Sequence, residues 1–82
     1  MARRKELTFI NLLKNTNAYK KYLKNEKENI SEDEIKEALR VETLTQKEIT
    51  KRNLSKYMDY SNKIKDKSVN NFLKFIKKRL NL

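Results

Sequence analysis

Residues 44–64, LTQKEITKRNLSKYMDYSNKI, fold either as one long helix or as two short ones. Wound as one helix, their apolar residues spread over an arc of about 180°, which encloses the polar side chains of Asn53 and Ser61. A turn at residues 53–55 removes this conflict. Asn53 suits such a turn, because asparagine tolerates the left-handed conformation better than other non-glycine residues. We favour two helices and keep one continuous helix as the alternative.

A helix start is predicted just before this stretch, in ISEDE at residues 30–34. Ser31 and Glu34 have the spacing of a capping box, and Ile30 and Ile35 have that of a hydrophobic staple. The helix that follows carries a narrow apolar stripe and an otherwise acidic exterior. We expect that exterior to be a solvated face that points away from any bound polyanion.

The same two patterns recur at the start of the 44–64 stretch. Thr45 and Glu48 have the spacing of a second capping box, and Leu44 and Ile49 that of a second staple. The sequence therefore predicts a second helix start near residue 45, with Ile49 facing inward.

The N-terminal segment is predicted to break at residues 15–17, NTN. A single helix through this point would not bring the apolar residues on either side onto one face. Asn15 would end the first helix, and Thr16 or Asn17 would cap the second. We expect residues 1–6 to form a basic arm. Residues 7–10, LTFI, are also compatible with a short strand, as in ribbon-helix-helix dimers.

The C-terminal segment is predicted to be an amphipathic helix that starts at Ser68. On a helical wheel, Asn70 and several lysines lie opposite the apolar arc, whose members are Val69, Phe72, Leu73, Ile76 and Leu80. Phe75 lies off that arc. It is a candidate exposed anchor for a partner, or else it packs against a neighbouring helix or a second copy of the chain.

The composition excludes several classes of protein. The 82 residues include no Gly, Pro, Cys or His. Tight hairpin turns usually recruit Gly, so its absence favours helices joined by polar turns with Asn in the left-handed positions. We therefore predict an all-α single domain (residues 1–82): a small bundle of four to five short helices with a helix-turn-helix-like core and no β-sheet. We predict no enzyme activity, no cofactor and no metal site.

The charge of +10 is unevenly distributed along the chain. Residues 1–25 carry +6, residues 26–48 carry −4 and residues 49–82 carry +8. Two cationic ends favour a polyanionic partner, most simply nucleic acid, although a lysine-rich surface that binds nothing is the alternative. Because no apolar run is long enough to cross a membrane, we expect a cytoplasmic protein with no membrane partner.

Residues 45–52, TQKEITKR, resemble the first helix of helix-turn-helix DNA-binding proteins, in which TQKEIAKR-like openings are familiar. The following residues, Asn53, Leu54 and Ser55, are one residue short of the family's pattern and lack its Gly. The resemblance implies a reading helix from Lys56 to Lys65, with Tyr57 among the groove-facing residues.

A second resemblance covers residues 49–82, which are similar in rhythm to the helical core-binding domain of tyrosine recombinases. In that domain a link corresponding to KSVNN, residues 67–71 here, joins a helix to a final aromatic-rich helix around DNA. Both resemblances imply duplex DNA as the partner.

We therefore expect a small basic DNA-binding protein, a regulator or accessory factor of a plasmid, phage or other mobile element. We expect it to form a homodimer. The alternative is an inhibitor or adaptor that docks through Phe75 on an acidic or nucleic-acid-binding surface of a larger protein. The predicted nucleic-acid contacts are Arg3, Arg4, Lys5, Lys51, Arg52, Lys56, Tyr57, Lys63, Lys65, Lys67, Lys74 and Lys78.

Overall fold

The computed structural model describes residues 3–82, with side chains from Lys5 onward. Within this range no strand occurs, so the predicted all-α fold is confirmed. No helix in the described range is long and apolar enough to cross a membrane. The elements in chain order are α1 (Arg3–Lys14), α2 (Asn17–Leu23), the 3₁₀ helix η1 (Lys27–Asn29), α3 (Glu32–Leu39), α4 (Lys47–Lys63) and α5 (Lys67–Arg79).

The break between α1 and α2 lies where the sequence predicts it. The Thr16 hydroxyl donates to the Leu13 carbonyl at 2.7 Å and accepts from the Tyr19 amide at 3.4 Å, so Thr16 caps α2. The alternative strand is wrong, because residues 3–14 are helical. Residues 3–6 of the predicted basic arm belong to α1, and residues 1–2 lie outside the described residues. Glu6 lies within the expected arm and is buried.

The capping box at α3 is confirmed. The Ser31 hydroxyl accepts from the Glu34 amide at 3.2 Å, and the Glu34 carboxylate accepts from the Ser31 amide at 2.9 Å. Ile35, Ala38 and Leu39 are buried, as the narrow apolar stripe predicts.

Residues 47–63 form one unbroken helix, so the favoured turn at residues 53–55 is wrong and the continuous alternative is confirmed. The two polar residues inside its apolar arc have distant partners. Asn53 donates from Nδ2 to the Leu39 carbonyl at 3.0 Å. The Ser61 hydroxyl donates to the Met58 carbonyl at 2.9 Å and accepts from Asn70 Nδ2 at 3.2 Å. Because these groups are hydrogen-bonded, their burial does not break the helix.

The second capping box is also wrong. Helix α4 begins at Lys47 after Gln46, whose side chain makes no capping hydrogen bond. The Thr45 hydroxyl instead forms a hydrogen bond with that of Thr43 at 2.9 Å. Ile49, expected to face inward, is 46% exposed.

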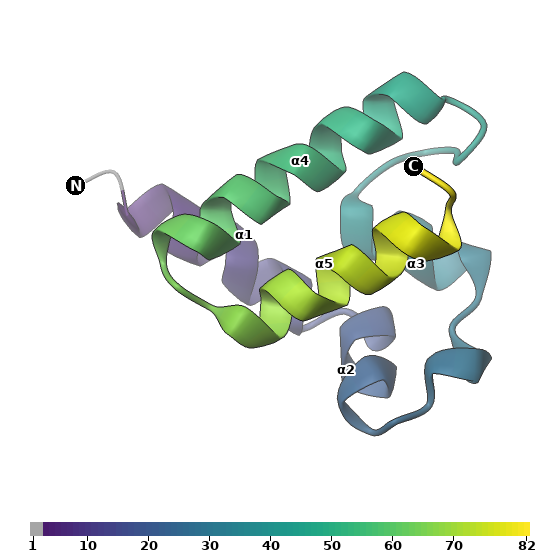
Figure 1. Cartoon of the computed structure of the whole chain (residues 1–82), viewed down its shortest axis with the longest axis horizontal. Helices are drawn as coiled ribbons and strands as arrows, with labels where there is room; N and C mark the ends of the chain where they lie inside the picture. Colours follow the sequence, from purple (N-terminus) through teal and green to yellow (C-terminus); the bar gives the residue numbers. More distant parts are fainter. Residues whose placement is uncertain (1–2) are drawn as a thin grey trace.

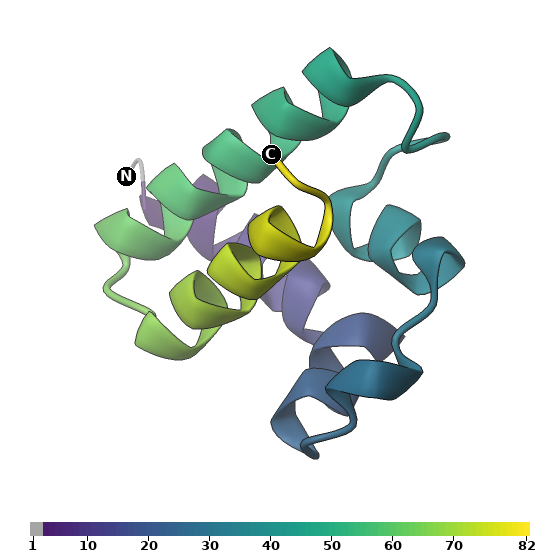
Figure 2. The same cartoon turned by 45° about the vertical axis from the view of Figure 1, so that its right-hand side comes forward.

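A tight turn at residues 64–66 joins α4 to α5. All five residues of the expected KSVNN link, 67–71, belong to α5, so that link is wrong, and Asp66 caps the helix instead of the predicted Ser68. Figure 1 and Figure 2 show α4 and α5 side by side across the near side of the molecule, with α1 behind them. We call α4, the turn and α5 the hairpin. Its apolar side meets the other helices in one core, whose fully buried members include Ile10, Leu13, Ile30, Phe72, Leu73 and Ile76.

Helices in this chain end in left-handed residues even though glycine is absent. Asn25 and Asn81 have positive φ, as predicted for asparagine. Arg40 and Lys65 do so as well, with φ of 56° and 58°. A cation after the last turn of a helix is favoured by the negative end of the helix dipole, which offsets part of the steric cost.

Candidate nucleic-acid interface

The outer face of α5 carries lysines and asparagines. The opposite face packs into the core through Val69, Phe72, Leu73 and Ile76. Because residues three and four apart share a helix face, the outer side forms one stripe along the whole helix. Its members are Lys67, Asn70, Asn71, Lys74, Lys77, Lys78 and Asn81.

Two adjoining depressions run along this stripe. The first, about 450 Å³, lies where α5 leaves the turn; the second, about 430 Å³, lies near the C-terminus. Lys74 lines both, so they form one surface, which we call the α5 groove. Its lining residues are Ser61, Asn62, Lys65, Asp66, Lys67, Asn70, Asn71, Lys74, Lys77, Lys78, Asn81 and Leu82.

Asparagine hydrogen bonds hold the two walls of the groove together. Asn70 Nδ2 contacts Asn62 Oδ1 at 2.6 Å and the Ser61 hydroxyl at 3.2 Å. These bonds fix α5 against the C-terminal half of α4, and the lysines stand on a rigid edge as a result.

Asp66 is the only carboxylate among the residues that line the α5 groove, and its charge is already compensated. Its Oδ1 accepts from the Val69 amide at 3.1 Å, and its Oδ2 lies 2.5 Å from Lys14 Nζ. These bonds outweigh the cost of burial and hold the Asp66 pKa below its ordinary value. The hydrogen bond to Asp66 also raises the Lys14 pKa. With the Asp66 pKa lowered and the Lys14 pKa raised, both groups are charged at neutral pH.

Four of the predicted nucleic-acid contacts lie in the α5 groove: Lys65, Lys67, Lys74 and Lys78. These four are exposed, and none of them forms an ion pair within the described part of the chain. Lys77 shares their face and was missing from the predicted set, although its spacing from Lys74 and Lys78 was a sufficient signal. The asparagines of the groove were also missing from the predicted contacts, although they share the face of these lysines.

The other predicted contacts do not join this surface. Lys5 is exposed on α1, and Lys51 and Arg52 are exposed on α4. Lys56 Nζ lies 5.4 Å from the centre of the Phe9 ring. Lys63 Nζ lies 3.9 Å from the Glu6 carboxylate. The side chains of Arg3 and Arg4 lie outside the described residues.

Two aromatic predictions are corrected. Tyr57 was expected to face a DNA groove, but it is 5% exposed and belongs to the core. Phe75 was expected to be an exposed anchor. It is half-buried, its ring centre lies 5.5 Å from that of Tyr22, and Lys27 Nζ lies 5.8 Å from it. It packs against a neighbouring helix, which is the other outcome the sequence allows.

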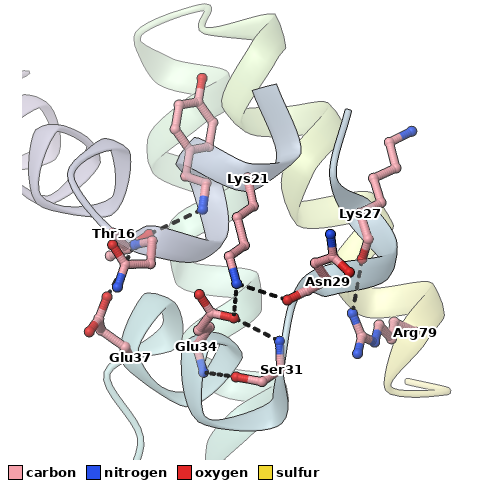
Figure 3. Close-up of polar contacts among 10 residues, drawn as sticks. Thr16, Lys21, Lys27, Asn29, Ser31, Glu34, Glu37 and Arg79 are labelled. Atoms are coloured by element: carbon pink, nitrogen blue, oxygen red, sulfur yellow. Dashed lines mark hydrogen bonds and ion pairs between the residues drawn. The ribbon is translucent and has the colours of Figure 1, made fainter. Parts of the chain in front are cut away.

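The anionic middle of the chain is tied to α2 and to the end of α5. Figure 3 shows Lys21 reaching from α2 to the Glu34 carboxylate and the Asn29 carbonyl, both at 2.9 Å. In the same view Arg79 donates to the Lys27 carbonyl at 3.4 Å. The hydrogen bond from the Ser31 amide lowers the Glu34 pKa, and the hydrogen bond from Lys21 lowers it further. Some N-terminal cations therefore compensate internal carboxylates and are not available to a partner.

Within residues 3–82 no group of three or more metal-ligating side chains is clustered. Searches with this chain found no match among protein-family models, curated proteins or solved structures.

Proposed function

We propose that this chain is a small nucleic-acid-binding protein that holds duplex DNA against the α5 groove. The observation that carries the proposal is the continuous lysine and asparagine face of α5, in which the single carboxylate is already paired with Lys14. Phosphate contacts from lysine position a protein on DNA and supply most of its non-specific affinity.

The dimensions and chemistry of α5 fit this role. Helix α5 has 13 residues and is therefore about 20 Å long. The major groove of duplex DNA is wide enough to admit an α-helix. Asparagine side chains are suited to paired hydrogen bonds with adenine edges, and Asn71 on α5 and Asn81 just after its end are exposed. The proposal moves the DNA-contacting element from residues 56–65 to α5, because Tyr57 and Ser61 are buried.

The salt dependence of binding tests the proposal. Five lysines line the groove (Lys65, Lys67, Lys74, Lys77 and Lys78). If each neutralises one phosphate, the logarithm of affinity falls with the logarithm of salt concentration at a slope of about −4.5. Fluorescence anisotropy with a labelled duplex, repeated with the single strand, measures this slope. A flat salt response contradicts the proposal.

A matched pair of variants separates this surface from general basicity. The double variant Lys74→Gln/Lys78→Gln removes two groove charges, and Lys20→Gln/Lys24→Gln removes two exposed charges that line neither depression. The first should flatten the slope by about 2 and weaken binding roughly 60-fold near 0.1 M salt. The second should leave both nearly unchanged. Equal losses in the two variants would mean that net charge, and not the groove, binds DNA.

We propose more specifically that the chain is a regulator or accessory factor of a mobile element and that it binds DNA as a homodimer. A chain this short contacts few base pairs, and a second copy would double the site. Analytical ultracentrifugation with and without duplex measures the stoichiometry. One chain per duplex at saturation would contradict the dimer and leave the α5 proposal standing.

A protein-binding role is the second candidate, and a different surface favours it. A depression of about 720 Å³ lies between the α1–α2 junction and the end of α3. Leu12 on its rim is 44% exposed, beside Val41. An apolar rim on a polar depression is typical of a protein interface. This candidate gains support if the wild-type chain gives the flat salt response with DNA that contradicts the α5 proposal.

A further inference from the structure

A small cavity lies on the other flank of α4, away from the α5 groove. Phe9 of α1, Arg40 at the end of α3, and Asn53, Lys56 and Tyr57 of α4 line it. The three α4 residues share one face, because they are spaced three and four apart. Its volume is about 180 Å³. A water molecule takes about 30 Å³ in the liquid, so a tetrahedral oxyanion fits with room for its hydration.

The lining of this cavity is cationic. Arg40 and Lys56 both contribute to it, and no carboxylate lines it. Neither cation has an ion pair among the described residues. Lys56 Nζ is held over the Phe9 ring, at 5.4 Å from its centre. Two like charges at one cavity repel each other, and a bound anion would relieve that repulsion.

Tyr57 also lines this cavity and brings a hydroxyl that can donate a hydrogen bond. The residue as a whole is 5% exposed. Among the described residues the buried side-chain polar atom without a partner is a Glu6 carboxylate oxygen, so the Tyr57 hydroxyl keeps contact with solvent. Burial raises the Tyr57 pKa, and the nearby positive charge of Arg40 opposes that rise. The hydroxyl therefore stays protonated at neutral pH, as a hydrogen-bond donor must.

The backbone at Arg40 positions its guanidinium group. Arg40 is left-handed, with φ 56° and ψ 46°, at a place where Gly or Asn is the usual residue. Asn53 fixes the neighbouring wall through its hydrogen bond to the Leu39 carbonyl. Arg40 therefore leaves the end of α3 at a point that is anchored to α4.

We propose that this cavity binds one phosphate group, with Arg40 and Lys56 supplying the charge and the Tyr57 hydroxyl donating a hydrogen bond. The phosphate could be the terminal group of a nucleic-acid strand or free inorganic phosphate. The cavity shares no residue with the α5 groove, so the site does not depend on the proposed DNA-binding role.

The first test is a ¹H–¹⁵N NMR titration of the whole chain with inorganic phosphate, at constant ionic strength in chloride. We expect saturable shifts at Asn53, Lys56, Tyr57 and Arg40. Arg40→Asn keeps a residue that tolerates positive φ and removes the guanidinium, so it should weaken binding about tenfold or more. Shifts that grow linearly without saturation, together with no preference in the second test, would overturn the proposal.

Two further variants separate the site from general effects. Tyr57→Phe removes only the hydroxyl and should weaken binding several-fold while the fold persists. Arg52→Gln removes an exposed charge that does not line the cavity and should leave the phosphate affinity unchanged. If Arg52→Gln weakens binding as much as Arg40→Asn does, the phosphate is held by diffuse charge and the proposal fails.

The second test compares one oligonucleotide with a 5′-phosphate and with a 5′-hydroxyl. Tighter binding of the phosphorylated strand, lost in Arg40→Asn, identifies a strand terminus as the source. Equal binding of the two strands with saturable inorganic phosphate identifies the free ion. The Lys74→Gln/Lys78→Gln variant should leave the inorganic phosphate titration unchanged, which distinguishes failure of the cavity from failure of the α5 groove.

Discussion

Asp66 stabilises the hairpin in two separable ways. One carboxylate oxygen caps α5 through the Val69 amide, and the other pairs with Lys14 on α1. The loss of a helix cap costs about 1 kcal/mol. An ion pair of this kind contributes about 0.5–1 kcal/mol, since the Lys14 side chain is 40% exposed and the Asp66 side chain is 16% exposed. Asp66→Ala should therefore lower the free energy of unfolding by about 1.5–2 kcal/mol.

Asp66→Asn separates the two contributions, because asparagine caps a helix as well as aspartate does and carries no charge. It should cost only about 0.5–1 kcal/mol, the share of the ion pair. In a domain of this size each kcal/mol shifts Tm by about 4–8 °C. Urea denaturation followed by circular dichroism at pH 7 measures both variants. Asp59→Asn is the control, since Asp59 is exposed and has no ion pair in the described chain.

The pH dependence gives the sign of the charge contribution. The folded-state pKa of Asp66 is lowered, so its stabilisation is present above the ordinary carboxyl range near pH 4 and is lost as the pH falls through and below that range. The Lys14 pKa is raised, so the pair persists until strongly basic pH, where Lys14 loses its proton. The difference between wild type and Asp66→Asn should thus be largest near pH 7 and shrink steadily as the pH falls below about 4. Equal stabilities for Asp66→Ala and Asp66→Asn, or a difference that persists at low pH, would refute this reasoning.

Three further predictions concern the helix ends and the continuity of α4. Lys65→Gly removes the backbone strain of a lysine in the left-handed conformation and should stabilise the chain by about 0.5–1 kcal/mol. It should also lower the magnitude of the salt slope of DNA binding by about 1. A destabilised variant would contradict the strain. Ser31→Ala should cost about 1 kcal/mol in urea denaturation, whereas Thr45→Ala should cost under about 0.5 kcal/mol because Thr45 does not cap α4. Leu54→Ala should cost about 2–4 kcal/mol and Ile49→Ala under about 1 kcal/mol, as their exposures of 2% and 46% require; the reverse order would favour a broken helix.

Local signals were sufficient at Ser31 and Thr16, where the capping partner is close in sequence and no other group competes for it. The Ser31 box needs only Glu34, and the break before α2 needs only the Thr16 hydroxyl and the Tyr19 amide three residues on. The lysine face of α5 follows from spacing alone. Thr45 shows the limit of such signals, because its hydroxyl had a competing partner in Thr43 that a capping pattern does not consider.

The continuity of α4 could not be read locally. The sequence argues for a break because a single helix buries Asn53 and Ser61. Their partners are Leu39, fourteen residues away, and Asn70, nine residues away. Only the packing of α3 and α5 against α4 brings those groups within hydrogen-bond distance. A polar residue on an apolar face therefore predicts a turn only when no neighbouring helix can satisfy it.

Which cationic side chains remain unpaired likewise depends on the tertiary structure. The sequence shows +6 in residues 1–25 and +8 in residues 49–82, and suggests that both ends serve one partner. In the fold, Lys14 pairs with Asp66 across 52 residues, and Lys21 pairs with Glu34 across 13. The lysines of the α5 groove have no such partners among the described residues. Internal carboxylates thus take up part of the N-terminal charge, whereas the lysines of the α5 groove stay exposed and unpaired on one surface.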